Sequence, residues 1–183
     1  MERATGCDKR SVLNLLVLSD LWFLGIFSAL GNHGSNPLAQ KGENMNLFQK
    51  LRSMKVLLID DDEWIRDSLE LFFAGEGCSL LALPTAEDGM EALVAESYDI
   101  IICDYKLPGM NGLSFFKEIE KSHPETFKVL ITAYGSEDVA TEATRMGIHD
   151  FIQKPLTANS IEKSLASLVE QYEKKNGEIR TRG

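Results

Sequence analysis

Six polar side chains follow short apolar runs of this sequence, and their types could carry chemistry together. They are Asp60, Asp61, Asp62, Asp104, Thr132 and Lys154. The three consecutive acids follow KVLLI, Asp104 follows DIIIC, the threonine closes KVLIT and the lysine follows HDFIQ. Carboxylates that converge repel one another, so a cluster of them calls for a hard divalent cation, and oxygen ligands favour Mg²⁺.

Asp104 is the predicted nucleophile, because its run would form the central strand of a sheet. A cation beside a carboxylate suits phosphoryl transfer, since it neutralises charge on the moving group while the carboxylate oxygen attacks. The hydroxyl of Thr132, the ammonium of Lys154 and a backbone amide near Tyr105 would then bind the phosphoryl oxygens. A single acid at a strand end is more simply a solvated turn residue, but the complete set favours a site.

Five β-rich apolar runs alternate with amphipathic stretches, and this alternation predicts strands that alternate with helices. The runs are KVLLID (55–60), CSLLAL (78–83), DIIICD (99–104), KVLITA (128–133) and HDFIQK (149–154). The pattern is typical of an α/β domain with a doubly wound, five-stranded parallel sheet covered by helices. Ligands bind such sheets at the carboxyl ends of the strands, near a topological switch point. The fold would therefore gather the polar side chains at one edge.

Four segments carry these residues in order: LLIDDDEWIR, IIICDYKLPGMNGL, VLITAYG and DFIQKPL. With them, the stretch from Met54 to about Glu173 resembles the response-regulator receiver domain of two-component signalling. The resemblance implies a flavodoxin-like (βα)5 fold with strand order 2-1-3-4-5. It also implies that Asp104 accepts a phosphoryl group from the histidine of a sensor histidine kinase or of a histidine phosphotransfer protein.

The resemblance further implies a set of ligands for the cation. Asp61 and Asp104 would bind Mg²⁺ directly, together with the backbone carbonyl of Lys106, and Asp60 would act largely through water. Asp62 continues the acidic run but has no implied role, so it is interpreted as a solvated residue.

Two residues are implied to respond to the phosphoryl group, and two more to shape that response. Lys154 would bridge to the group, and its peptide bond to Pro155 would be cis, which proline permits. Thr132 would couple to an aromatic residue of the fifth strand, here Phe151, whose lack of a hydroxyl leaves packing and burial to drive any rotation. Phe151 is also open to interpretation as a plain core residue. The ring of Tyr134 is predicted to shield the acyl phosphate and to prolong its lifetime.

Length and charge limit the remaining function classes. The chain has 183 residues and a formal net charge of −9, with the acidic excess after residue 53. This length predicts one domain, and the acidity disfavours direct nucleic-acid binding, because basic patches bind phosphate backbones. Three cysteines without paired or metal-ligand spacing favour a cytoplasmic protein.

The predicted organisation is an N-terminal extension at 1–53, a receiver domain at 54–175 and a tail at 176–183. No DNA-binding output domain is expected to follow. The signal should therefore pass to a downstream protein target, which the sequence does not identify, through altered protein contacts. The fourth helix, fifth strand and fifth helix are the expected surface for these contacts, and for a homodimer.

The extension contains an apolar segment at 12–30, followed by a polar linker. The segment is long enough to span a bilayer as a helix, but Asp20 near its centre is unfavourable in hydrocarbon. Basic residues before it would keep the N-terminus inside and place the acidic domain outside. Three interpretations stay open: a membrane anchor or docking helix, a signal peptide, and an upstream extension that is not part of the native folded unit.

Two other functions compete with the phosphoryl-accepting domain. A phosphatase of the haloacid dehalogenase type also begins with a strand-end aspartate and a second one two residues later, here Asp60 and Asp62. That family places a threonine or serine soon afterwards, whereas this sequence has Glu63 and Trp64. The other alternative is a scaffold that resembles a receiver and binds partners without phosphorylation, which the complete set of acids, threonine and lysine disfavours.

Overall fold

A computed structural model describes residues 47–133 and 137–181 of the chain. The apolar segment 12–30 and Tyr134 lie outside the described residues, so the interpretations given for them stay predictions. Over the part of the chain that is described, no helix combines the length and the apolar character needed to cross a bilayer.

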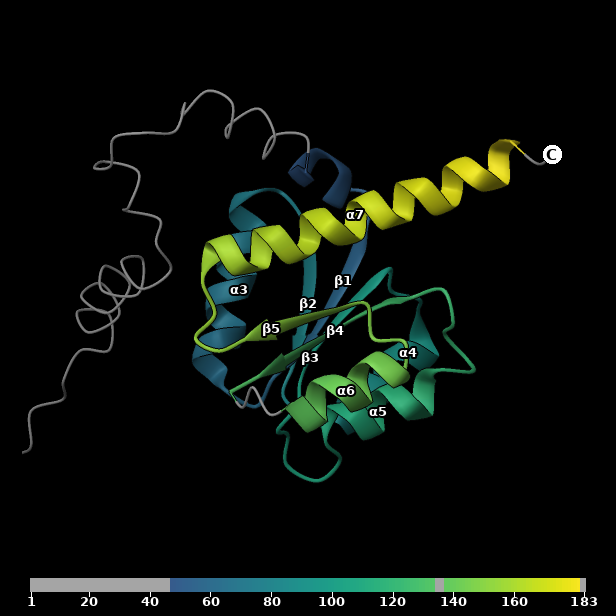
Figure 1. Ribbon diagram of the computed structural model, residues 1–183. Coiled ribbons are helices and arrows are strands. Elements are labelled where there is room, and N and C mark those ends of the chain that lie inside the picture. The colour runs from purple at the N-terminus through teal and green to yellow at the C-terminus, as the bar shows by residue number, and fades with distance from the viewer. Residues whose placement is uncertain (1–46, 134–136, 182–183) are drawn as a thin grey trace, which may run out of the picture.

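The predicted doubly wound α/β fold is confirmed. Five parallel strands form one sheet in the order β2-β1-β3-β4-β5. The strands are β1 (Lys55–Ile59), β2 (Ser79–Leu83), β3 (Ile100–Asp104), β4 (Phe127–Thr132) and β5 (Asp150–Gln153). The helices are α3 (Glu63–Gly75), α4 (Ala86–Ala95), α5 (Gly112–Ile119), α6 (Glu137–Arg145) and α7 (Ala158–Thr181). Helices α3 and α7 cover one face of the sheet, and α4, α5 and α6 cover the other (Figure 1).

The sheet separates two apolar cores, because successive side chains of a strand point to opposite faces. Val56 and Leu58 of β1 pack under α3 and α7, whereas Leu57 and Ile59 pack under α4 and α5. All residues of the central strand β3 are buried, while the edge strand β2 is only partly covered. Burial on both faces explains why the central strand has a continuous apolar sequence.

Helix caps set the turns that follow the strands. Asp62, Thr85 and Asn111 are the N-caps of α3, α4 and α5, and the side chain of each accepts a backbone N–H of the first turn. At the start of α5, a Cβ atom on Gly112 would come within 2.3 Å of the carbonyl oxygen of Asp104. Only glycine therefore lets α5 begin so close to the end of β3.

A short helix at residues 47–51 precedes β1 and adds to the core under α3 and α7. Leu47, Phe48 and Leu51 are buried there. The ammonium of Lys50 lies 2.9 Å from the carboxylate of Glu173 on α7. The folded unit thus includes residues before position 54, where the sequence suggested that the domain begins.

Candidate functional site

Four strand ends bring the predicted site residues to one edge of the sheet. Asp104 and Thr132 are the last residues of β3 and β4, while Asp60 follows β1 and Lys154 follows β5. Asp60, Asp104 and Thr132 are buried, whereas the Lys154 side chain keeps 21% of its surface exposed. This is the edge at which parallel sheets of this kind bind ligands.

Lys154 joins two of the carboxylates. Its Nζ atom donates a hydrogen bond to Asp104 Oδ2 at 2.5 Å and lies 3.0 Å from Asp60 Oδ2. Its backbone N–H donates to the Thr132 carbonyl at 2.8 Å, and its peptide bond to Pro155 is cis, as the resemblance implied. Burial alone would lower the pKa of Lys154, but the hydrogen bond to Asp104 and the charge of Asp60 raise it above its ordinary value. The ammonium is therefore a stable positive charge at this edge.

The Asp60 carboxylate is buried, and its two oxygens contact a backbone N–H and an ammonium. Its Oδ1 atom accepts the backbone N–H of Asp62 at 3.0 Å. Its Oδ2 atom lies 3.0 Å from Lys154 Nζ, so the ammonium is the charged partner of this buried oxygen. Burial raises the pKa of Asp60, while the Asp62 N–H and the Lys154 ammonium oppose the rise. Asp60 shares this one ammonium with Asp104, so the pair keeps an excess of buried negative charge that is suited to binding a metal ion.

Three carboxylates form a compact group of ligands at the site. Oxygen atoms of Asp60, Asp61 and Asp104 all lie within 4.8 Å of one another. Two of these residues are buried and Asp61 is exposed, so a bound ion would keep access to water, as Mg²⁺ prefers. Lys106 donates its backbone N–H to Asp104 Oδ1 at 3.2 Å, and the role of its carbonyl as a ligand stays a prediction. The donor set fits Mg²⁺.

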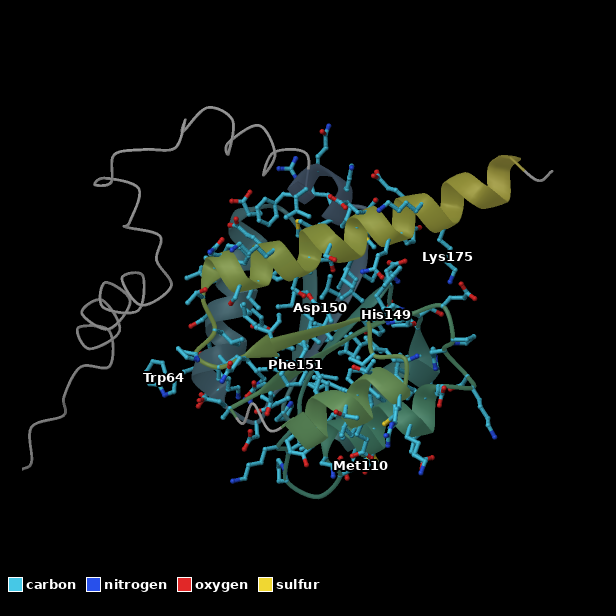
Figure 2. All side chains as sticks on the ribbon, viewed as in Figure 1. Trp64, Met110, His149, Asp150, Phe151 and Lys175 are labelled. Atoms are coloured by element: carbon cyan, nitrogen blue, oxygen red, sulfur yellow. The ribbon has the colours of Figure 1, made fainter. Side chains whose placement is uncertain are left out.

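The predicted switch residues lie on the neighbouring strands β4 and β5. Thr132 is in register with Gln153, and Leu130 is in register with Phe151. Phe151 is half-buried and packs against the core under α4, α5 and α6 (Figure 2). This position suits both a plain core residue and a residue that rotates, so the switch role stays a prediction.

Two contacts near the site were missed from the sequence. Asp62, interpreted as a solvated residue, is the N-cap of α3, and its Oδ1 atom accepts the Trp64 backbone N–H at 2.9 Å. An aspartate directly before an amphipathic helix is a known N-cap signal that could have shown this. Arg66 donates from Nη1 to the Asp60 carbonyl oxygen at 2.8 Å, and no spacing rule indicates that contact.

An apolar groove of about 310 Å³ lies between α3 and the start of α7, and we call it the α3–α7 groove. Its apolar lining includes Trp64, Ile65, Phe72, Pro155, Leu156 and Ile161. Trp64 is 57% exposed and extends outward from α3 (Figure 2). Asp62 and Lys154 also line this groove, so it is continuous with the carboxylate site.

Known proteins are similar to this chain over its folded domain. Residues 56–166 match the family model described as the response regulator receiver domain. The chain is 30% identical over 128 residues to the DNA-binding transcriptional regulator NtrC of Escherichia coli K12, covering 68% of this chain and 27% of that protein. It is 35% identical over 107 residues to the response regulator protein FleR of Pseudomonas aeruginosa, covering 58% and 23%. The chain thus spans about a quarter of the length of these curated relatives.

Solved structures show the same fold. A CheY-like response regulator receiver domain protein from Methanospirillum hungatei is 26% identical, with a TM-score of 0.58 over 71% of this chain and 98% of that one. A receiver domain protein from Clostridium thermocellum has a TM-score of 0.61 at 24% identity, covering 66% and 97%. The chain belongs to the receiver domain family of two-component response regulators.

Proposed function

We propose that Asp104 is the phosphoryl acceptor of this domain, and that a phosphohistidine of a sensor histidine kinase or a histidine phosphotransfer protein is the donor. A carboxylate oxygen of Asp104 forms the new bond to phosphorus while the phosphorus–nitrogen bond of the phosphohistidine breaks. The leaving imidazole keeps the bonding electrons and takes up a proton. The observation that carries the proposal is the buried Asp104 carboxylate within ligand distance of Asp60 and Asp61 and hydrogen-bonded to Lys154.

Each neighbouring group has a part in binding the transferred phosphoryl oxygens. Mg²⁺, held by Asp60, Asp61 and Asp104, would neutralise charge on the group. The ammonium of Lys154 contacts the Asp104 carboxylate, so it could instead bind an oxygen of the phosphoryl group once the acyl phosphate forms. Thr132, the last residue of β4, would offer its hydroxyl from the same edge. The carbonyl of Lys106 would complete the metal ligands.

The α3–α7 groove is the proposed docking surface for the histidine-bearing partner. It shares Lys154 and Asp62 with the carboxylate site, so a protein seated there would hold its histidine beside Asp104. The exposed indole of Trp64 supplies the kind of large apolar anchor that dominates protein interfaces. The donor obtains its phosphoryl group from ATP, which supports a cytoplasmic location for the reaction.

The output is proposed to be a change of protein contacts at α6, β5 and α7. Phe151 of β5 lies one strand away from Thr132 and packs towards α6, so repacking there would alter this surface. The surface could bind the downstream target or a second copy of the chain. Tyr134 would set how long the acyl phosphate survives.

The competing functions have weaker support. Asp62, the second acid that a dehalogenase-type phosphatase requires, is engaged as the cap of α3. A scaffold that works without phosphorylation would not need two buried carboxylates that share one ammonium. The chain also has the complete set of acids, threonine and lysine.

A labelling experiment tests the proposal directly. The full chain is incubated with acetyl phosphate and Mg²⁺, and its intact mass is measured over time. We expect one phosphoryl group per chain in the native protein and none in Asp104→Ala or after chelation of the metal. Asp62→Asn keeps the helix cap and should still be labelled. Labelling of Asp104→Ala, or turnover of a generic phosphate ester without stable labelling, would contradict the proposal.

A further inference from the structure

The guanidinium of Arg66 reaches back from α3 to the main chain at the end of β1. Its Nη1 atom donates to the carbonyl oxygen of Asp60 at 2.8 Å. Arg66 lies near the start of α3, whose first turn is marked by Trp64 in Figure 2. The contact therefore joins Asp60, one of the three clustered carboxylates, to the helix α3 that follows it.

The sheet ladder explains why this carbonyl takes a side-chain donor. The last bond between β1 and β2 runs from the Asp60 N–H to the Leu83 carbonyl at 3.1 Å. In a parallel pair the Asp60 carbonyl would next accept a backbone N–H from beyond Leu83. The residue after Leu83 is Pro84, β2 ends at Leu83, and Thr85 is already the N-cap of α4. The guanidinium of Arg66 donates in place of that continuing strand.

Asp60 is then held at three points. Its N–H is fixed by Leu83, its carbonyl by Arg66 and its Oδ1 atom by the N–H of Asp62. Asp60 has no exposed surface, so water cannot readily replace a missing donor to its carbonyl. Removing the guanidinium would free the turn at residues 60–62, from which two of the three carboxylates project.

We propose that Arg66 is a positioning residue for the metal-binding turn, and that its hydrogen bond to the Asp60 carbonyl sets the Mg²⁺ affinity of the site. The inference rests on the proposed function, because it concerns the same carboxylate group. It goes beyond that function in assigning a role to a residue that touches neither the metal nor the phosphoryl group.

The direction in which Mg²⁺ affinity changes when Arg66 is replaced distinguishes a positioning role from an effect of its charge. Arg66 is a cation near a cation site, so loss of its charge alone would tighten Mg²⁺ binding. Loss of its hydrogen bond would weaken binding, because the carboxylates would no longer be held together. Residues that orient metal ligands in this way change metal affinity by roughly tenfold or more when they are removed.

The test compares three variants of the full chain by calorimetric titration with Mg²⁺. Arg66→Met keeps much of the apolar stem and removes the donor, whereas Arg66→Lys keeps the charge and one donor group. Arg52→Met is the matched control, because Arg52 donates from Nε to the Glu76 carbonyl at 3.0 Å, at the other end of α3. Thermal unfolding is measured for each variant, so that a general loss of stability is recognised.

We expect the Kd for Mg²⁺ to rise roughly tenfold in Arg66→Met, to recover most of the way in Arg66→Lys and to stay unchanged in Arg52→Met. An unchanged or lower Kd in Arg66→Met would overturn the inference, and so would an equal loss in Arg52→Met. If the native chain binds Mg²⁺ and is labelled while Arg66→Met binds equally well, only the role of Arg66 fails. If the native chain neither binds Mg²⁺ nor is labelled, the proposed function fails.

Discussion

Lys154 Nζ lies 2.5 Å from Asp104 Oδ2, although Asp104 ends β3 and Lys154 follows β5, and these strands are not neighbours in the sheet. The lysine side chain reaches past the end of β4, where Thr132 is located, to contact the carboxylate at the end of β3. The contact therefore connects the acceptor to the loop between β5 and α7. Because Lys154 belongs to that loop and contacts Asp104 directly, a change of charge at Asp104 would act directly on the loop.

This relationship predicts the effect of removing the ammonium. In Lys154→Met, we expect the rate of Asp104 labelling by acetyl phosphate to fall about 10²-fold, the usual effect of losing one group that stabilises developing negative charge. The rate is measured by intact mass against time, with saturating Mg²⁺. Lys117→Met, which changes an exposed lysine on α5, serves as the control. Equal rates in the native protein and Lys154→Met would contradict a direct role.

The α3–α7 groove predicts a defect that depends on the donor. Trp64→Ala should slow transfer from a phosphorylated histidine protein by roughly tenfold or more, because large aromatic anchors dominate interface energies. Labelling by acetyl phosphate should stay unchanged, since Trp64 is not part of the carboxylate group. Leu71→Ala is the control, because Leu71 is 60% exposed on the same helix and does not line the groove. A loss with both donors would assign Trp64 to the fold and not to docking.

The short helix at 47–51 predicts a contribution to stability from outside the segment that matches the family model. Phe48 is 4% exposed, and its ring packs edge-on against that of Phe72 of α3, with the two ring centroids 5.7 Å apart. Phe48→Ala should lower the free energy of unfolding by about 3 kcal/mol, as for other large-to-small changes in a core. Val94→Ala, at a position that is 89% exposed, should change it by less than about 0.5 kcal/mol. Urea unfolding measures both.

His149 predicts a dependence of stability on pH. Its Nδ1 atom accepts the Lys128 backbone N–H at 3.1 Å, which requires this nitrogen to be unprotonated. Burial, together with the charges of Lys128 and Lys175, lowers the pKa of His149 below its ordinary value of 6.5. The unfolded chain therefore binds the proton more readily than the folded chain. The contribution of neutral His149 to the free energy of unfolding is present above pH 6.5 and is lost as the pH falls through the pKa of the folded state.

The measurement for His149 is the urea midpoint between about pH 7 and about pH 5. The native protein should lose more stability over this range than His149→Asn, which keeps a side-chain acceptor but does not titrate. Parallel profiles for the two proteins would show that the imidazole does not contribute. His149 directly precedes β5, which begins at Asp150, so the measurement also reports on the start of that strand.

The sequence was sufficient to predict the fold and the gathering of the site, because both follow from alternating apolar runs and from where those runs end. The positions of Asp60, Asp104, Thr132 and Lys154 depend on strand order, which the motifs implied. The Arg66 contact could not be predicted, because it depends on where β2 stops relative to β1. Burial of Leu47, Phe48 and Leu51 was also missed, since the short helix at residues 47–51 is too short for a helical pattern to be recognised.

The helix at residues 47–51 and the later part of α7 lie together, joined by Lys50 and Glu173, at the end of the sheet where the strands begin. The carboxylates occupy the opposite end. Residue 47, where the described part of the chain begins, and the later part of α7 therefore lie on the side of the domain away from the proposed phosphorylation chemistry. A tag or module fused directly before residue 47 or after residue 181 should leave the approach of a phosphodonor unobstructed.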